Sequence, residues 1–229
     1  MGQRLLLQRG VKEWPPLAAL CGVGTTFGLT VPAMGWWAVP LAAVPYLVAH
    51  LALVRARRTK RTYRQTIGAL GRIPEAGGFS APGHAERTAE LAVAIGSQRG
   101  LSSKEIDRVE QAALLHDIGR LVLNDPAVAA GSYSTRDLAQ WSAAIVAEVR
   151  HLEPVADIVA EHYRPYRRPG EERDESVAVP AQVVKVASAY SVALAGGMSP
   201  SDSLELLHRG SAYDYDPRMV TALRRILQR

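Results

Sequence analysis

The sequence contains little of what defines several common protein classes. It has a single cysteine, Cys21, in 229 residues, so no disulfide framework can hold the chain together. No alternation of apolar and polar residues runs longer than a few positions, which argues against β-strands. There is also no internal repeat, which excludes solenoid and propeller architectures. The apolar residues that remain recur at helical spacing, and we therefore expect an all-α protein.

The longest absence is one of charge. From Trp14 to Val54 there are 41 residues without Asp, Glu, Lys or Arg. As one helix, at about 1.5 Å per residue, this stretch would far exceed a hydrocarbon core of about 30 Å, so it fits two membrane spans better than one. We expect the break at Pro32–Trp37, where two tryptophans suit a membrane interface. The alternative is a buried helical hairpin in a soluble protein.

The net charge of +5 is divided unevenly along the chain. Residues 1–75 hold ten Lys/Arg and two Asp/Glu, a net +8, whereas residues 76–229 hold 17 and 20, a net −3. The basic residues lie on both sides of the uncharged segment. The positive-inside rule then predicts a multi-pass protein of the cell membrane with both termini cytoplasmic. These flanks can contact anionic lipid, and they give no reason to expect a nucleic-acid polymer as partner.

The distribution of charge and of helix-breaking residues predicts the organisation of the chain. Residues 1–58 form a membrane hairpin with basic flanks, residues 59–82 a connecting helix and linker, and residues 83–229 a helical domain. The run Pro74–Gly83 is rich in glycine and proline and marks the start of this domain. Helices are expected at about residues 84–98, 102–118, 135–151, 154–163 and 180–195, with two more beginning at Pro200 and Pro217.

One of these helices carries an adjacent His116-Asp117 pair near its end. Ser102 and Glu105 have the spacing of a capping box, which predicts the start of the helix. Gly119 suits the left-handed residue that ends it. A carboxylate in the last turn is poorly placed for the helix dipole, which is negative there. Either a metal ion or a nearby arginine is expected to offset it.

These residues resemble the HD superfamily of metal-dependent phosphohydrolases. In that family a His, a His-Asp pair and a distant Asp hold divalent metals in an all-helical domain. Gly83-His84 resembles the segment with the first His, and Ala113–Gly119 resembles the His-Asp motif. The likeness extends to the HD-GYP branch, which cleaves cyclic di-GMP, and Tyr215-Asp216-Pro217 resembles a Phe-Asp-Pro near its end. The resemblance covers roughly residues 83–228.

The resemblance implies a set of metal ligands. Imidazole and carboxylate together suit Mn, Fe, Ni or Zn better than calcium. Glu161-His162 is the best match to a His-His-Glu segment of the HD-GYP branch. The implied ligands are His84, His116, Asp117, Glu161 and His162.

The resemblance also implies catalytic roles for Asp117 and Arg120. Asp117 would hold the metal that activates a water, and it would bridge two ions if two were bound. Arg120 stands where the HD-GYP branch usually carries Lys, and a guanidinium also binds phosphate.

The sequence departs from the family at the distal ligand. Ser188 occupies the position of the last metal-binding Asp, and Ser191 that of a second Asp that often follows. The Gly-Tyr-Pro signature is absent, as is a His expected near residues 136–141. A neutral hydroxyl is a weak ligand beside a carboxylate, so we expect one weak metal site or a site that has lost its metal.

Three functions follow from these patterns. The first is a membrane-anchored phosphohydrolase that acts on a nucleotide or cyclic dinucleotide. The second is a non-catalytic signalling module that binds a nucleotide, a protein partner or a second copy of the chain. The third is a relic in which the helix before His116-Asp117 only packs the core.

Overall fold

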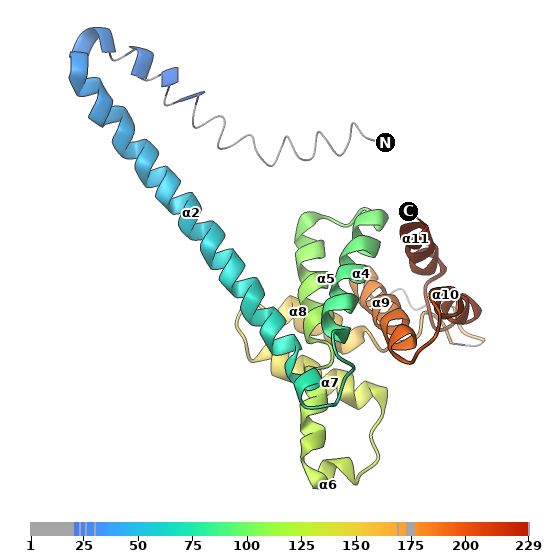
Figure 1. Ribbon diagram of the computed structural model, residues 1–229. Coiled ribbons are helices and arrows are strands. Elements are labelled where there is room, and N and C mark those ends of the chain that lie inside the picture. The colour runs from blue at the N-terminus through green and yellow to red at the C-terminus, as the bar shows by residue number, and fades with distance from the viewer. Residues whose placement is uncertain are drawn as a thin grey trace. The chain divides into compact units, whose positions relative to one another are not determined.

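The structure is a computed structural model that describes residues 21–22, 24–25, 27–29, 31–168, 170–172 and 177–228. These residues form helices and no strand, so the prediction of an all-α fold is confirmed (Figure 1). The elements in chain order are η1 (Gly35–Trp37), α2 (Ala38–Gly71), α3 (Ile73–Ala76), α4 (His84–Arg99), α5 (Ser103–Leu115), η2 (Ile118–Asn124), α6 (Pro126–Ala129), α7 (Thr135–Ala147), α8 (Glu153–Glu161), α9 (Val179–Ala195), α10 (Pro200–Arg209) and α11 (Pro217–Leu227).

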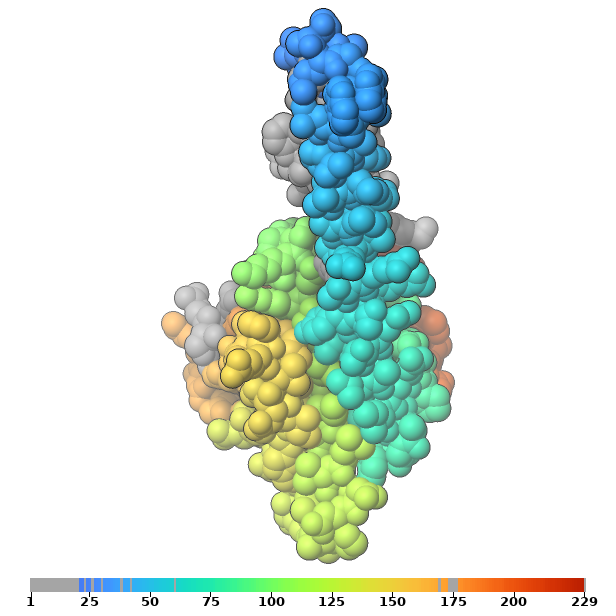
Figure 2. Space-filling model, turned by 90° about the vertical axis from the view of Figure 1, so that its left-hand side faces the viewer, coloured from blue at the N-terminus to red at the C-terminus, as the bar shows by residue number. Residues whose placement is uncertain are grey.

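The chain divides into two compact units, Met1–Tyr63 and Arg64–Arg229. In the first unit, Gly35 has a φ of 55° and lies inside the stretch where a break between two spans was predicted. Beyond it, Val39–Ala76 is a helical run long and apolar enough to cross a membrane, judged by length and composition alone. Its large apolar side chains from Val39 to Leu53 are exposed, in the part of the chain drawn in blue, whereas Ile67 further along the run is buried (Figure 2). The other span of the expected hairpin lies largely outside the described residues.

The core of the second unit forms where α4, α5 and α9 pack against one another (Figure 1). Each contributes fully buried apolar side chains, among them Ile95, Val109 and Val183. Burial of one such side chain stabilises the fold by about 1.5–3 kcal/mol. Helix α8 packs on α5 and also on α7, while α11 packs against α4. The three central helices therefore hold rigid positions from which side chains can be aimed at a common point.

The helices begin where the capping residues predicted. Ser102 accepts a hydrogen bond from the Glu105 amide, and the Glu105 side chain accepts one from the Ser102 amide, so the capping box before α5 is confirmed. Ser134 and Asp137 form a second capping box at the start of α7. Proline occupies the first turn of α8, α9, α10 and α11, where its missing amide proton costs nothing.

The prediction for Gly119 was wrong. Helix α5 ends at Leu115, and the chain continues through His116 and Asp117 into the 3-10 helix η2. Gly119 does not have a positive φ. Glycine is required there for a different reason, because a Cβ atom would lie 2.4 Å from the backbone nitrogen of Ser142 on α7. Helix η2 packs so closely on α7 that a side chain at this position has no room.

Candidate metal centre

His84 is the first residue of α4 and is buried, with 3% of its surface exposed. Its Nδ1 lies 3.0 Å from the Ser191 hydroxyl of α9. A hydroxyl can accept the hydrogen bond from an Nδ1–H group, which leaves the lone pair on Nε2. Burial and, after it, the neighbouring His116 lower the pKa of His84 to about 4, against the opposing effect of Asp117. His84 is therefore neutral near pH 7, the state in which imidazole binds metals.

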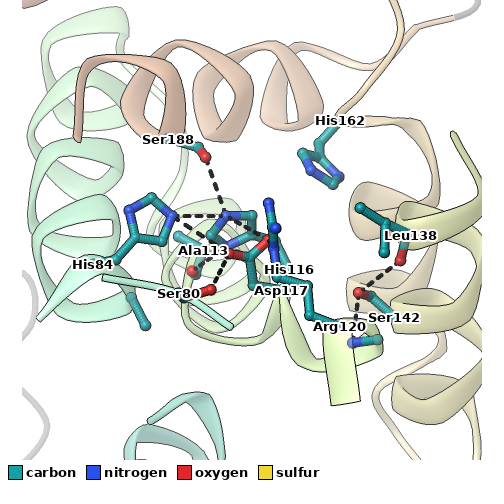
Figure 3. Close-up of polar contacts among 12 residues, drawn as sticks. Ser80, His84, Ala113, His116, Asp117, Arg120, Leu138, Ser142, His162 and Ser188 are labelled. Atoms are coloured by element: carbon teal, nitrogen blue, oxygen red, sulfur yellow. Dashed lines mark hydrogen bonds and ion pairs between the residues drawn. The ribbon is translucent and has the colours of Figure 1, made fainter. Parts of the chain in front are cut away.

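His116 follows α5 directly and is equally buried. Its Nδ1 lies 2.9 Å from the carbonyl oxygen of Ala113, one turn earlier. Because a carbonyl only accepts, the proton of the neutral ring is on Nδ1 and the lone pair is on Nε2. That Nε2 lies 3.2 Å from the Nε2 of His84 and 3.1 Å from the Ser188 hydroxyl (Figure 3).

Asp117, the residue directly after His116, completes the cluster. Its carboxylate accepts a hydrogen bond of 2.7 Å from the Ser80 hydroxyl and lies 2.8 Å from Nε of Arg120. Its oxygens lie 3.7 Å from Nε2 of His84 and 3.6 Å from Nε2 of His116. Burial raises the pKa of Asp117, but His116, Arg120 and the bond from Ser80 outweigh burial and hold the pKa well below its ordinary value. Asp117 is therefore a carboxylate near pH 7.

The three side chains together form a donor set that fits a cation. Among the described residues, His84, His116 and Asp117 offer ligand atoms that all lie within 4.8 Å of one another. With both rings in the tautomer that carries its proton on Nδ1, two imidazole lone pairs and a carboxylate face one small space. Lone pairs this close repel, and a cation relieves that repulsion. A nearby arginine was the alternative means of offsetting the Asp117 charge, and it is present as the ion pair between Asp117 and Arg120.

Two cavities open on this cluster and share Asp117, Arg120 and Val192 in their walls. One, of about 330 Å³, extends past Phe79 and Ser80. The other, of about 220 Å³, lies on the side of α8 and α9 and is lined by His116, His162, Tyr163, Lys185, Ser188 and Tyr215, among others. A ligand atom held at the cluster can therefore belong to a molecule that extends in either direction.

Lys185 is a functional candidate that the sequence analysis missed. Its Nζ donates hydrogen bonds to the carbonyls of Tyr163 and Arg164, at 3.1 and 2.8 Å, and lies 5.7 Å from the ring centre of Tyr215. Burial lowers its pKa to about 8, against the attraction of Asp214. The signal in the sequence was a lone lysine inside an apolar helix, three residues before Ser188. Ser80, the partner of Asp117, gave no such signal.

Glu161 and His162 lie outside the group of converging ligand atoms. The Glu161 carboxylate pairs with Arg164 at 2.5 Å. His162 lies 2.6 Å through Nδ1 from the carbonyl of Val159, and its ring meets that of His116 edge-on with centroids 5.4 Å apart. Figure 3 shows His84 and His162 on opposite sides of His116. Their role as ligands stays a prediction, as does the catalytic role of Arg120.

The basic segment at residues 163–168 packs on the loop before α11. The amide of Arg167 donates to the carbonyl of Tyr213 at 2.8 Å, and its guanidinium lies 5.0 Å from the ring centre of the same tyrosine. The amide of Tyr166 donates to the carbonyl of Asp214. This packing places Tyr163 and Tyr215 in the wall of the smaller cavity.

Comparison with known proteins gives two kinds of likeness. Residues 83–193 match the family model of the HD domain. None of the curated protein sequences compared with this chain matches it. Among solved structures, the chain is similar to a cyclic GMP-AMP-specific phosphodiesterase of V. cholerae, with a TM-score of 0.59 and 19% identity over 72% of this chain. It is also similar to Bd1817, an HDG“Y”P protein from Bdellovibrio bacteriovorus, with a TM-score of 0.50 and 18% identity over 72% of this chain.

The aligned regions span 48% and 62% of those two chains. At these identities the two structures show a shared fold.

Proposed function

We propose that the protein is a metal-dependent phosphohydrolase acting on a nucleotide or cyclic dinucleotide, on the premise that residues 83–193, which match the family model of the HD domain, form such a domain. The observation that carries the proposal is the convergence of His84, His116 and Asp117 on one space. The two cavities that meet there give a substrate access to it.

The chemistry follows from the donor set. A divalent metal held by His84 Nε2, His116 Nε2 and the Asp117 carboxylate would polarise a phosphoryl oxygen and lower the pKa of a water. The neutral imidazole of His84 supplies a lone pair without adding positive charge. Asp117 stays ionised because its pKa is held below the ordinary range. Arg120 is about one-third exposed and faces both cavities, so its remaining N–H groups can donate to a phosphate oxygen.

The residues of the smaller cavity support a nucleotide as substrate. Lys185 adds a second cationic group to that of Arg120, and two cations suit a substrate with more than one negative charge. Tyr163 and Tyr215 offer aromatic surfaces to a base. The phosphodiesterase of V. cholerae is described as specific for cyclic GMP-AMP. That description is consistent with a cyclic dinucleotide here, and the chemistry of the cavity fits nucleotides as a class.

The donor set also narrows the choice of metal ion. Two imidazoles and one carboxylate suit Mn, Fe, Ni or Zn. With Ser188 in place of a carboxylate, the protein supplies three strong ligands and leaves coordination positions for water and substrate. We expect weaker binding than in a site with a fourth protein ligand.

We further propose that the apolar N-terminal region anchors the protein in a membrane. Support comes from the 41 uncharged residues, the length of the Val39–Ala76 run and the basic residues that flank it. The partner of this region is then lipid. Extraction of membranes with alkaline carbonate tests it: an anchored chain stays in the pellet, and a peripheral chain is released.

A second function, a non-catalytic nucleotide-binding module, is favoured by one observation. Ser188 lies 3.1 Å from His116 Nε2, where its hydroxyl hydrogen-bonds the ring that would otherwise bind a metal. In that function the cavities and the two cations are kept, and hydrolysis is lost.

Hydrolysis by the purified full chain in detergent separates the two functions. The chain is supplemented with Mn²⁺ and offered nucleotides and cyclic dinucleotides, beside the variants His116→Ala and His208→Ala. His208 is an exposed residue of α10, far in sequence from the cluster, and serves as the matched control. An enzyme loses turnover in His116→Ala alone. Binding without turnover in the wild type supports the non-catalytic module.

A further inference from the structure

The segment before α4 lies outside the residues matched by the HD family model, yet it contacts the metal centre. We propose that Glu75, on α3, is a positioning residue that fixes the start of α4 and thereby aims His84 at the centre. The inference rests on the proposed function for its meaning, because positioning matters only if His84 binds a metal.

The Glu75 carboxylate binds the two backbone amides on either side of His84. Its Oε2 accepts a hydrogen bond of 2.7 Å from the amide of Gly83, and its Oε1 accepts one of 2.9 Å from the amide of Ala85. Such bonds between a carboxylate and backbone amides are charge-assisted and about twice as strong as neutral ones. Glu75 is half-buried, which protects both bonds from competing water.

Helix α4 has no N-cap side chain of its own that could bind the free amides of its first turn. A helix start leaves four amides without internal partners, and Ser, Thr, Asp or Asn at the N-cap usually binds one of them. The N-cap of α4 is Gly83, which makes no side-chain cap. By contrast, Ser102 and Ser134 cap α5 and α7 from within. Glu75 therefore supplies the cap of α4 from another helix, and its negative charge also suits the positive end of the helix dipole.

The position of His84 depends on this cap. His84 is the first helical residue, and the preceding Gly83 has a φ of 71°. Glycine passes between conformations at little cost, so the backbone at this point has no stiffness of its own. If the first turn frays, the His84 ring moves away from His116. The Nε2 atoms of the two rings lie 3.2 Å apart. Displacement of a ligand by about 1 Å is enough to weaken a metal site seriously.

The neighbours of Glu75 contact the stretch that carries the other two ligands, His116 and Asp117. Ser80 donates its hydrogen bond to Asp117. Gly71, at the end of α2, packs on the carbonyl of Leu114 so closely that a Cβ atom would lie 2.3 Å from the oxygen, two residues before His116. Residues 71–80 thus hold the stretches that carry His84, His116 and Asp117, and within this segment Glu75 makes the two bonds that flank a ligand directly.

The variant Glu75→Gln tests the role, with Glu90→Gln as the control. Glutamine keeps the shape but offers one acceptor oxygen, and it turns an NH₂ group toward a backbone N–H. Glu90 lies on the exposed side of α4, so its replacement makes the same change of charge away from the start of that helix. The full chain in detergent is titrated with Mn²⁺, and amide hydrogen exchange is followed at residues 83–87 without metal.

We expect Glu75→Gln to weaken Mn²⁺ affinity by about 10-fold or more, as for other groups that orient metal ligands. Exchange at residues 83–87 should speed up in this variant before any metal is added, and Glu90→Gln should match the wild type in both measurements. If Glu75→Gln folds too poorly to titrate, Glu75→Asp keeps the charge but is too short to reach both amides, and the same loss of affinity is expected.

Other outcomes would overturn the inference in distinguishable ways. Wild-type affinity in Glu75→Gln, or unchanged exchange at residues 83–87, removes the positioning role and leaves the proposed function standing. A wild-type chain that binds no Mn²⁺ removes the proposed function first, and the positioning role with it, whatever the variants do.

Discussion

The two sides of the metal centre differ in how much of a binding site they retain. On the side of α4 and α5, His84, His116 and Asp117 converge, and each is held by a partner of its own. On the side of α8 and α9, a serine hydroxyl stands at residue 188, the Glu161 carboxylate is paired with Arg164, and no carboxylate among the described residues joins the converging ligand atoms. One half of a metal site can therefore keep its geometry although the other half has lost its charge.

The difference between the sides is mainly electrostatic. Among the described residues that line the two cavities, Asp117 is the only carboxylate, whereas Arg120 and Lys185 are both cationic. A dication is attracted less strongly to such a site than to one with a second acidic residue. An anionic substrate is attracted more strongly. This arrangement lowers the affinity for a metal ion and raises the attraction for phosphate, and substitutions at different residues should change the two effects separately.

Removal of the single carboxylate should have the largest effect. Asp117→Asn deletes the one negative ligand and leaves Arg120 without its ion pair, so we expect metal binding to fall by more than about 100-fold and turnover to vanish. Titration with Mn²⁺ and an assay of hydrolysis measure both. Retention of metal within a few-fold of the wild type would show that the imidazoles alone hold it, contrary to the account.

Restoring a carboxylate to the other side should strengthen the site. Ser188→Asp places a second acidic group beside His116, and we expect Mn²⁺ affinity to rise by about 10-fold to 100-fold. Without metal, the same variant should unfold at a lower temperature, because two buried carboxylates then repel each other. Ser201→Asp, on the exposed start of α10, is the control. If affinity does not change, α9 is too far from the metal to contribute a ligand.

Lys185 should affect the substrate and not the metal. Lys185→Met removes one cation from the smaller cavity, and we expect KM for a nucleotide to rise by about 10-fold, as for loss of one charge-assisted hydrogen bond. Mn²⁺ affinity should stay within about twofold of the wild type. A fall in metal affinity together with an unchanged KM would mean that Lys185 supports the fold of the centre and does not meet the substrate.

The smallest expected effect is a pH dependence of stability. Burial lowers the pKa of His84 and of His162 to about 4, below the ordinary value of 6.5. Between pH 6.5 and pH 4 the unfolded chain binds protons that the folded chain does not, so stability without metal falls as pH falls through this window. Urea unfolding at pH 7 and pH 5 measures it. His162→Gln should lose about half of the difference, and an equal difference in this variant would assign it to other groups.

The sequence predicted the all-α fold and the helix starts because both depend on local chemistry. The capping box at Ser102 and the prolines that open α8 to α11 act on their own helices, and neighbours in sequence suffice to find them. The convergence of His84 with His116 rested on resemblance alone, since 32 residues separate them.

The sequence could not predict what depends on packing between distant helices. Gly119 looked like a helix terminator, but the close approach of α7 explains it. Ser80 and Glu75 lie in a stretch that read as a linker, and their hydrogen bonds to Asp117 and to the start of α4 exist only once the helices have assembled. The contacts of Lys185 exist because the turn after α8 brings two carbonyls to it.

The most direct test of the central claim is the metal content of the purified full chain and of its His116→Ala variant. The account predicts near-stoichiometric Mn, Fe, Ni or Zn in the wild type and its loss in the variant, because three ligands on the α4 and α5 side suffice. Absence of metal from both proteins, even after supplementation, would contradict this interpretation and leave a folded helical domain whose cavities serve binding alone.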